Sequence, residues 1–402
     1  MTFALISTIQ PSSGGVEAKT RWVVDELAAL GISSVLAWYE PWSCSPELSV
    51  PLAQIGSGKR PGHRCLQVWP EVSGHAIGAW LPELEFTHYQ PIRPWRQLIA
   101  AADLHIAITG NPLCGHRFLA SGKPFLAWIG TPWHGDRVDR VKLFPWHRRL
   151  VDRWLNAPVL QSMERRVLRA PQGRLLTISH HTARELQIIS GRPATAGVLY
   201  RPSDPALFYP APSRRVPWRI GFSGRYSDPR KQIHLLLNAV ALLVKQGHPV
   251  QLELTGEASG HFLQSAIAAR QLTNNVHCHA YLEPAELAAV LQQWDLFVIP
   301  SHQEGLCIAA LEAMACGVPV VSTRCGGPED FVLPNRTGIL VAAEAGALAM
   351  AIKAVCGVPG LRRQLADGAL RWIHNHADPA TARRNLRSHL KAVYPKLEIA
   401  DA

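Results

Sequence analysis

Short apolar runs that end at turn residues alternate along the chain with longer segments whose apolar positions recur every three or four residues. Such alternation is typical of βαβ units that build a parallel sheet. Residues 3–9 form the first predicted strand, and 16–30 form the helix after it, in which Trp22, Val23 and Leu27 recur at helical spacing. The further strands predicted in this part of the chain are 34–38, 104–108, 125–129 and 175–178.

A proline-rich passage over residues 200–217 interrupts all periodicity, and we interpret it as the link between two domains. Beyond it the alternation resumes, with a predicted helix over 231–246 that Gly247 ends. The strands predicted in this second part are 218–222, 251–255, 295–299 and 318–322. The sequence therefore predicts two α/β domains.

The composition agrees with folded domains, because 47% of the 402 residues are hydrophobic and 18% are charged, which excludes intrinsic disorder. Eight cysteines are scattered without a Cys-x-x-Cys pair, so we expect reduced, mostly buried thiols and a cytoplasmic protein. The first residues lack the basic region of a signal peptide. The longest apolar run, 235–244, is about half a membrane span.

The densest candidate chemistry lies between residues 300 and 317, PSHQEGLCIAALEAMACG. We expect a strand to end at Ile299 and a helix to begin near Leu306 and stop at Gly317. A helix N-terminus at the carboxyl edge of a parallel sheet offers N–H groups to an anion. A diphosphate is therefore expected on the amides of Leu306, Cys307 and Ile308.

Two carboxylates belong to this segment, Glu304 in the loop and Glu312 in the helix. The helix is almost wholly apolar or small, so Glu312 should be buried and should need hydrogen-bond donors. Ribose hydroxyls or a pair of backbone amides would serve. Taken singly, each residue is more simply interpreted as a solvated acid, but their pairing across a loop and helix favours a site.

A second junction of strand, loop and helix carries cations, in the segment 222–231, FSGRYSDPRK. Arg225 has the geometry to hold phosphate oxygens bidentately, and Lys231 would act as a mobile point charge. Arg230 competes for the role of the lysine. A basic loop is by itself more often a solvated turn, and its place at a strand end favours a phosphate site.

The N-terminal part offers weaker candidates. Residues 12–15, Ser-Ser-Gly-Gly, follow the first strand, where missing side chains let the backbone approach a ligand. His134 lies just past the predicted strand 125–129, although 18 histidines in the chain make any single one a common bystander.

Several motif searches give negative results. Residues 56–60, GSGKR, resemble a phosphate-binding loop only superficially, since Ala53 and Arg60 occupy the positions of its first Gly and its Ser/Thr. No Gly-x-Gly-x-x-Gly follows the first strand, no Asp-x-Asp pair is present, and His277-Cys278-His279 lacks partners at zinc-ligand spacing. We therefore expect no metal and no cofactor.

Together, Glu304 and Glu312 form a Glu-x7-Glu motif within EGLCIAALEAMACGVPVVST. With GRYSDPRK, the Gly14-Gly15 loop and CGGPEDFV, this motif resembles the retaining glycosyltransferases of family 4. The resemblance covers essentially the whole second domain and the turn and loop residues of the first. It implies the GT-B fold, in which two Rossmann-like α/β domains face each other across a cleft. The implied parts are an acceptor domain 1–200, a nucleotide-sugar domain 201–375, and a helix within 376–402 that packs on the first domain.

The resemblance also implies roles for single residues. Arg225 and Lys231 would bind the donor diphosphate, Glu304 the sugar hydroxyls and Glu312 the ribose. His134 matches a histidine that touches the donor sugar, so His134, Glu304, Arg225 and Lys231 are the catalytic candidates. The other donor-binding candidates are Gly14, Gly15, Gly224, Tyr281, Leu282, Gly305, Leu306, Cys307 and Ile308.

Two departures from the family pattern bear on the donor. Leu306 and Cys307 stand where many members have Phe-Gly, which adds side chains beside the sugar, and Ala280 replaces a frequent Gly near the base. Neither change removes a proposed contact, but both leave the identities of sugar and base open.

The implied reaction moves a hexosyl or related sugar from a nucleotide-diphosphate sugar to a hydroxyl acceptor, with retention of configuration. The two cations and the helix dipole would stabilise the departing diphosphate without a metal. One alternative is a GT-B epimerase or phosphorylase acting on similar ligands. Another, from a different class, is a basic nucleic-acid-binding protein, but the chain has no recognised binding module, so no nucleic-acid partner is expected.

The excess of 41 Lys+Arg over 30 Asp+Glu, a formal charge of +11, is concentrated in two stretches. Residues 134–169 hold nine bases and four acids, with Trp146 and Trp154 between them, and 361–402 hold eight bases and four acids. The resemblance puts both on the acceptor side. We hypothesise an anionic glycan or a lipid-linked acceptor, presented at an anionic membrane surface where the protein would be peripheral at the inner face. Solvated helix faces explain the charge equally well.

Overall fold

The computed structural model describes residues 2–11, 14–135, 137–211 and 218–397. It divides into two compact units. Unit 1 consists of Met1–Leu199 together with Arg383–Ala402, and unit 2 is Tyr200–Ala382. Of the proline-rich passage predicted as a link, residues 200–211 belong to the start of unit 2, and 212–217 lie outside the described residues.

Unit 1 is built on a sheet with the strand order β3-β4-β2-β1-β5-β6-β7-β8. Its pairs are parallel except for β3 and β4, among the strands that the structure describes. The strands are β1 Phe3–Thr8, β2 Ser33–Tyr39, β3 His63–Trp69, β4 Val72–Ile77, β5 Leu104–Thr109, β6 Phe125–Ile129, β7 Gly173–Thr177 and β8 Gly197–Val198. The predicted strands correspond to β1, β2, β5, β6 and β7, whereas β3, β4 and β8 were not predicted.

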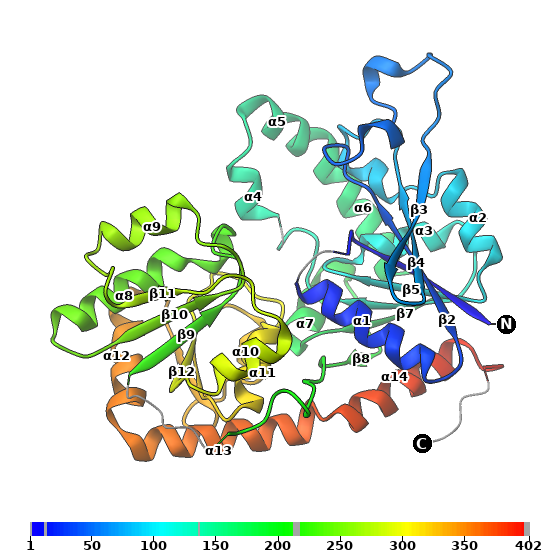
Figure 1. Ribbon diagram of the computed structural model, residues 1–402. Helices are drawn as coiled ribbons and strands as arrows, with labels where there is room; N and C mark the ends of the chain where they lie inside the picture. The colour runs from blue at the N-terminus through cyan, green and yellow to red at the C-terminus, as the bar shows by residue number, and fades with distance from the viewer. Residues whose placement is uncertain (1, 12–13, 136, 212–217, 398–402) are drawn as a thin grey trace. The chain divides into compact units, whose positions relative to one another are not determined.

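Helices flank this sheet (Figure 1). The α-helices of unit 1 are α1 Gly15–Ala28, α2 Arg93–Ala101, α3 His116–Leu119, α4 Val138–Lys142, α5 Trp146–Val151, α6 Ala157–Leu168 and α7 His180–Ser190. The short connecting helices are η1 Pro46–Leu48, η2 Leu52–Gln54, η3 Glu85–Tyr89, η4 Pro112–Gly115 and the π-helix η5 Asp152–Asn156. Because η5 directly follows α5 and precedes α6, residues 146–168 form one continuous helical segment.

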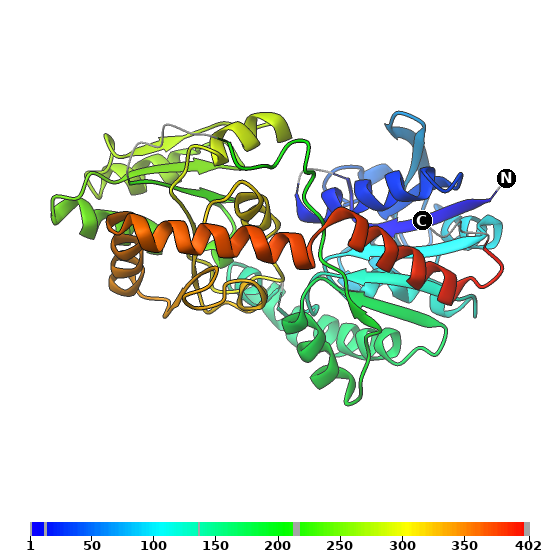
Figure 2. The same cartoon turned by 90° about the horizontal axis from the view of Figure 1, so that it is seen from below.

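The C-terminal helix α14 (Pro379–Val393) lies against unit 1 from Arg383 onward (Figure 2). Arg383 donates to both carboxylate oxygens of Glu26 on α1, at 2.8 and 3.0 Å. Just after the helix, the Tyr394 hydroxyl accepts from the backbone N–H of His105 at 2.7 Å. The end of the chain is thus bonded to a helix and a strand near its beginning.

Unit 2 is built on a parallel sheet with the strand order β11-β10-β9-β12-β13-β14. Its strands are β9 Arg219–Ser223, β10 Gln251–Thr255, β11 Val276–Cys278, β12 Leu296–Ile299, β13 Val320–Thr323 and β14 Gly338–Val341. Its helices are α8 Ile233–Lys245, α9 His261–Ala268, α10 Pro284–Leu291, α11 Ile308–Ala315, α12 Ala345–Gly357, α13 Pro359–His376 and the short η6 Pro229–Lys231 and η7 Gly327–Asp330.

Two helix boundaries in unit 2 differ from the predictions. The helix predicted from Lys231 begins at Ile233, because Lys231 ends a 3-10 turn and Gln232 has a φ of 50°. The helix predicted from near Leu306 begins at Ile308, because Cys307 has a φ of 71° and cannot continue a right-handed helix. Both differences fall at the loops that carry the candidate site.

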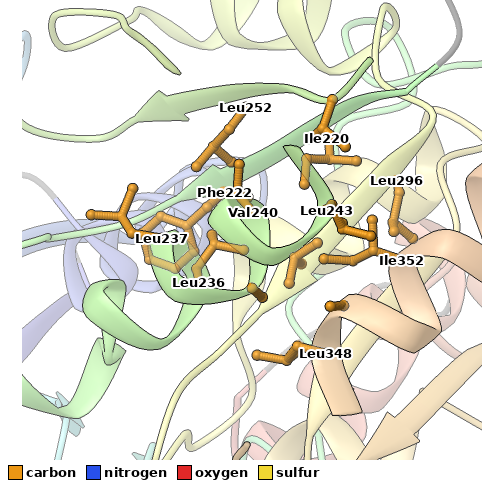
Figure 3. Close-up of a cluster of buried hydrophobic side chains, with 14 of the residues drawn as sticks. Ile220, Phe222, Leu236, Leu237, Val240, Leu243, Leu252, Leu296, Leu348 and Ile352 are labelled. Carbon is orange, nitrogen blue, oxygen red and sulfur yellow. The ribbon is translucent and has the colours of Figure 1, made fainter. Parts of the chain in front are cut away.

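The core of unit 2 packs α8 and α12 against the sheet (Figure 3). Ile220 and Phe222 of β9 and Leu252 of β10 contribute from the strands, while Leu236 and Ile352 contribute from the two helices. This burial fixes β9 and its neighbours, and so positions the loops that leave their carboxyl ends. In the described part of the chain no single helix is both long and apolar enough to cross a membrane, although the bent pair of 345–357 with 359–393 meets that length and composition test together.

Candidate active site

The candidate residues of unit 2 gather where the strand order of its sheet reverses. The chain runs from β9 to β10 on one side, and returns to pair β12 with β9 on the other. At such a point the loops after two adjacent parallel strands diverge and leave room for a ligand at the carboxyl edge. The loop after β9 carries Arg225 and Lys231, and the loop after β12 carries Glu304.

Lys231 and Glu304 are in direct contact across these two loops. The Lys231 ammonium lies 2.6 Å from Oε1 of Glu304, and the Ser301 hydroxyl donates to the same oxygen at 2.7 Å. Burial disfavours the charged lysine, but the adjacent carboxylate outweighs that effect and raises the pKa of Lys231 above its usual value. A buried, charged pair therefore faces the point where the two loops diverge.

Arg230, which the sequence left open as an alternative to Lys231, lies in the same loop. It is buried, its guanidinium donates to Oδ2 of Asp228 at 2.7 Å, and it also donates to Gln303 at 3.2 Å. Burial would raise the pKa of Asp228, but Arg230 and Arg225 together bring it down to about 2. Arg230 therefore joins the β9 and β12 loops.

Arg225 is the accessible cation of this loop. Its side chain is 63% exposed, and its guanidinium is tethered to Oδ2 of Asp228 at 3.1 Å. Since Asp228 is held by Arg230 as well, the two arginines share one carboxylate. This arrangement aims Arg225 without burying it, which suits a group that is to bind an incoming anion.

The loop before α11 is held by close backbone contact. A Cβ on Gly327 would lie 2.0 Å from the carbonyl oxygen of Gly305, so only glycine fits there. Glu304 pairs with this second loop, since its N–H donates to Cys325 and Gly327 donates to its carbonyl. Of the three predicted amides, that of Ile308 opens α11, that of Cys307 belongs to the N-cap residue in the left-handed region, and that of the buried Leu306 precedes the helix.

Glu312 has a partner that was not predicted. Arg201, near the start of unit 2, donates from Nη1 to Oε1 of Glu312 at 2.8 Å. Burial raises the pKa of the Glu312 carboxyl, and the guanidinium opposes that rise. The expectation of ribose hydroxyls or backbone amides as donors omitted this arginine, and the 111 residues between the two side chains left no local signal for it.

The remaining donor-binding candidates of unit 2 are Gly224, Tyr281 and Leu282. Gly224 follows β9, and its neighbour in the next loop, Gly256, approaches so closely that a Cβ there would lie 2.7 Å from the Gly224 carbonyl oxygen. Tyr281 is exposed and Leu282 is half-buried. Both follow β11, at the outer end of the strand order β11-β10-β9, so the sheet does not bring them into the same pair of loops as Lys231.

Unit 1 carries Gly14, Gly15 and His134. Gly14 has a φ of 129°, which favours glycine, and no atom lies within 4 Å of the place that a Cβ on Gly14 would take. Gly15 is the first residue of α1. Residues 12 and 13 lie outside the described part of the chain. His134, after β6, is half-exposed, and its Nε2 lies 4.0 Å from Oε2 of Glu185. Gly14 and Gly15 follow β1 and His134 follows β6, and β5 lies between these two strands in the sheet.

A buried acid that the sequence did not reveal supports the His134 loop. Glu164 on α6 accepts a hydrogen bond from the backbone N–H of Trp133 at 2.8 Å. Burial raises its pKa to about 7. Across the described residues, no group of three or more His, Cys, Asp or Glu side chains is placed to hold a metal ion.

The C-terminal part of the chain is similar to known proteins. Residues 217–357, about a third of the chain, match the family described as Glycosyl transferases group 1. The chain is 34% identical over 218 residues to the MMP alpha-(1->4)-mannosyltransferase of Mycolicibacterium hassiacum, covering 53% of this chain and 51% of that protein. It is 36% identical over 152 residues to the D-inositol 3-phosphate glycosyltransferase of Segniliparus rotundus, covering 36% and 33%. The chain thus spans about half of the length of the first of these curated relatives and a third of the second.

Solved structures match almost the whole chain at lower identity. The sucrose-phosphate synthase of Thermosynechococcus elongatus has a TM-score of 0.77 at 19% identity, covering 98% of this chain and 99% of that one. Anabaena Alr3699/HepE, solved in complex with UDP-glucose, has a TM-score of 0.66 at 17% identity and covers 98% and 100%. WaaG, a glycosyltransferase of lipopolysaccharide biosynthesis, has a TM-score of 0.68 at 15% identity and covers 95% and 99%. The chain therefore has the two-domain α/β fold of the GT-B glycosyltransferases.

Proposed function

We propose that this protein is a retaining glycosyltransferase, which moves a hexosyl or related sugar from a nucleotide-diphosphate sugar to a hydroxyl acceptor. The observation that carries the proposal is the buried contact between the Lys231 ammonium and the Glu304 carboxylate. It lies where the β9 and β12 loops diverge, within the segment that matches the group 1 family. A cation that stays charged beside a carboxylate at such an edge suits a ligand with both a diphosphate and hydroxyl groups.

The cations of the β9 loop would hold the donor diphosphate. Arg225 would pair with phosphate oxygens from the solvent side, and Lys231 would meet them from the buried side. Together with the first-turn amides of α11, they would stabilise the negative charge that develops as the diphosphate leaves. Glu304 would accept hydrogen bonds from sugar hydroxyls. Glu312, oriented by Arg201, would do the same for the ribose.

The transfer step breaks the bond between the anomeric carbon and the diphosphate oxygen, and it forms a bond from that carbon to the acceptor oxygen. For retention we propose attack from the face that the diphosphate leaves, with the acceptor proton passing to a departing phosphate oxygen. His134 is then proposed to touch the donor sugar rather than to act as the base. This route needs positioned charges more than a titrating side chain.

The donor and acceptor classes are proposed from the relatives. The two curated relatives are named as a mannosyltransferase and an inositol-phosphate glycosyltransferase, and HepE was solved with UDP-glucose. We therefore propose a nucleoside-diphosphate hexose as donor. An anionic acceptor would suit the positive net charge of +11.

Screening a panel of nucleotide-sugars for binding, by ligand-observed NMR and by thermal shift, would identify the donor. Lys231→Met and Glu304→Gln should each lower transfer about a hundredfold, on the order of 3 kcal/mol of lost transition-state stabilisation. Lys245→Met, at the exposed end of α8, the helix that follows Lys231, is the matched control and should behave as the wild type.

The NMR spectrum of the product decides between reactions. A new glycoside with the anomeric configuration of the donor supports the proposal, whereas an inverted glycoside overturns the retaining mechanism. A free epimer or a sugar phosphate as the product would identify an epimerase or a phosphorylase instead. Near-normal transfer by folded Lys231→Met and Glu304→Gln proteins would overturn the assignment of the site.

A further inference from the structure

The helical segment of α5 and η5 in unit 1 buries two polar side chains and exposes large apolar ones. Asp152 and Asn156 are each 6% exposed and point into the unit. Trp146 and Trp154 are 70% and 72% exposed, although they belong to the same segment. A surface helix of a globular protein normally buries its apolar side and exposes its charges. Figure 1 shows α4 and α5 extending away from the sheet of unit 1.

An ion-pair network fixes this reversed orientation. The Arg137 guanidinium is bound to both Asp152 on η5 and Glu85 on η3. Its charge also lies over the Trp133 ring, 5.3 Å from the ring centre, and the indole N–H of Trp133 donates to Glu85 at 3.2 Å. Because Asp152 is drawn inward by this network, the residues on the opposite side of the same turns face away from the unit. The exposure of the tryptophans is therefore a consequence of this ion-pair network.

The outward side carries a set of exposed apolar side chains, which we call the tryptophan patch. Trp146, Leu150 and Trp154 follow one another at intervals of four residues, so they lie along one side of the helical segment. Exposed neighbours widen the surface. The tryptophan patch consists of Leu143, Trp146, Leu150, Val151, Trp154 and Leu155.

Exposed cations border the tryptophan patch on its own segment. They are Lys142, Arg148, Arg149 and Arg153. The Arg153 guanidinium lies over the Trp154 ring at 5.4 Å, and that of Arg148 over the Phe144 ring at 4.7 Å. Between residues 141 and 156, all of which the structure describes, Asp152 is the single acid, and it is buried and paired. The surface thus combines exposed indoles and aliphatic side chains with positive charge and no exposed acid.

We propose that the tryptophan patch docks this protein on the surface of an anionic lipid bilayer. Indole rings favour the boundary between headgroups and hydrocarbon, and a border of arginines and lysines gains about 1 kcal/mol per cation, or about fivefold in affinity, near an anionic surface. A second copy of the chain fits less well, because a symmetric contact would place the same cations against one another. The docking surface lies within unit 1 and stands independently of the proposed reaction.

Co-sedimentation of the full-length protein with vesicles tests the proposal. Vesicles of equal parts phosphatidylcholine and phosphatidylglycerol should bind the wild type at low salt, with a blue shift of tryptophan fluorescence, and should bind it more weakly at high salt. Vesicles of phosphatidylcholine alone should bind it much less. Trp146→Ser/Leu150→Ser/Trp154→Ser should weaken binding on the order of 100-fold, because it removes the apolar contact.

Two further variants separate the contributions. Arg148→Gln/Arg149→Gln/Arg153→Gln should weaken binding to the anionic vesicles on the order of 100-fold and remove its salt dependence. Phe262→Ser/Met350→Ser, which changes two exposed apolar residues of unit 2, is the matched control and should bind as the wild type. Circular dichroism and nucleotide binding should be unchanged in all three variants.

Three results would overturn the proposal. The first is that the wild type fails to bind the anionic vesicles at low salt. The second is that the variant lacking both tryptophans binds them as tightly as the wild type. The third is a dimer, seen by light scattering, that this variant separates while vesicle binding persists, since the patch would then join two copies.

Discussion

The Arg201 guanidinium and the Glu312 carboxylate form an ion pair in unit 2, with 2.8 Å between Nη1 and Oε1 and side chains that are 17% and 12% exposed. Arg201 stands near the start of the unit and Glu312 on α11, so the pair ties the first residues of the unit to the helix that follows β12. An acid this well shielded from water depends on its partner to remain ionised.

Arg201→Met should therefore lower the free energy of unfolding by about 3 kcal/mol, because it leaves a shielded carboxylate without its cation. Adding Glu312→Gln to that variant should recover most of the loss, since no charge then remains unpaired. Urea denaturation of the wild type, both single variants and the double variant measures this coupling. Additive losses in the double variant would contradict it.

Arg225 and Arg230 should respond in opposite ways to replacement by alanine. Arg225→Ala removes an exposed side chain, so stability should stay within about 0.5 kcal/mol while transfer falls about a hundredfold. Arg230→Ala leaves the buried Asp228 with one tether and should cost about 3 kcal/mol. Thermal unfolding together with the transfer rate of each folded protein tests the contrast. Equal losses of stability in the two variants would refute the division of roles.

At position 307, glycine should give a more stable protein than alanine, which reverses the usual order of stability for these two residues. Both replacements remove the thiol, but at a φ of 71° alanine keeps the left-handed strain that glycine lacks. Cys307→Gly should be more stable than Cys307→Ala by about 1 kcal/mol. Cys316, with a φ of −81° after the same helix, is the matched control, and there Ala should be more stable than Gly. Chemical denaturation of the four variants gives both differences, and the same order at both positions would refute the argument.

Glu164 should make the protein less stable as the pH rises. Its pKa is about 7 when buried in the folded protein, against a model value of 4.5, so the folded state holds the proton more tightly. Its contribution to stability is therefore complete below about pH 4.5 and is lost as the pH rises through about 7. Glu164→Gln should flatten this part of the curve of unfolding free energy against pH, while the exposed Glu47→Gln should leave it unchanged. An unaltered slope in Glu164→Gln would show that this acid is not responsible.

The central strands were predictable because each is a compact apolar run. Residues 125–129 and 251–255 have the predicted bounds, since Phe125–Ile129 is buried throughout and Gln251–Thr255 is buried after its first residue. The hairpin of β3 and β4 was missed because β3, at the edge of the sheet, is mostly exposed and mixes His, Arg and Gln with apolar residues. Periodicity reports burial, and an edge strand with little burial gives little signal.

Sequence position predicted that some candidate residues lie at strand ends, but it did not predict their contacts. Sequence position alone placed Lys231 and Glu304 at the ends of strands, and their pairing follows from β9 and β12 being neighbours. The partners that hold them were not predictable in the same way. Arg201 reaches Glu312 over a long separation, and Arg230 is buried against Asp228. Both facts depend on tertiary packing.

The contacts of α14 with unit 1 have a consequence for synthesis on the ribosome. Glu26 meets Arg383 and His105 meets Tyr394 only after the whole of unit 2 has been translated. At about 5–20 residues per second, the 382 − 200 + 1 = 183 residues of Tyr200–Ala382 take on the order of 10 to 40 seconds to emerge. The first half of the chain must therefore wait, with α1 and β5 uncovered where α14 will pack, until the last helix leaves the ribosome.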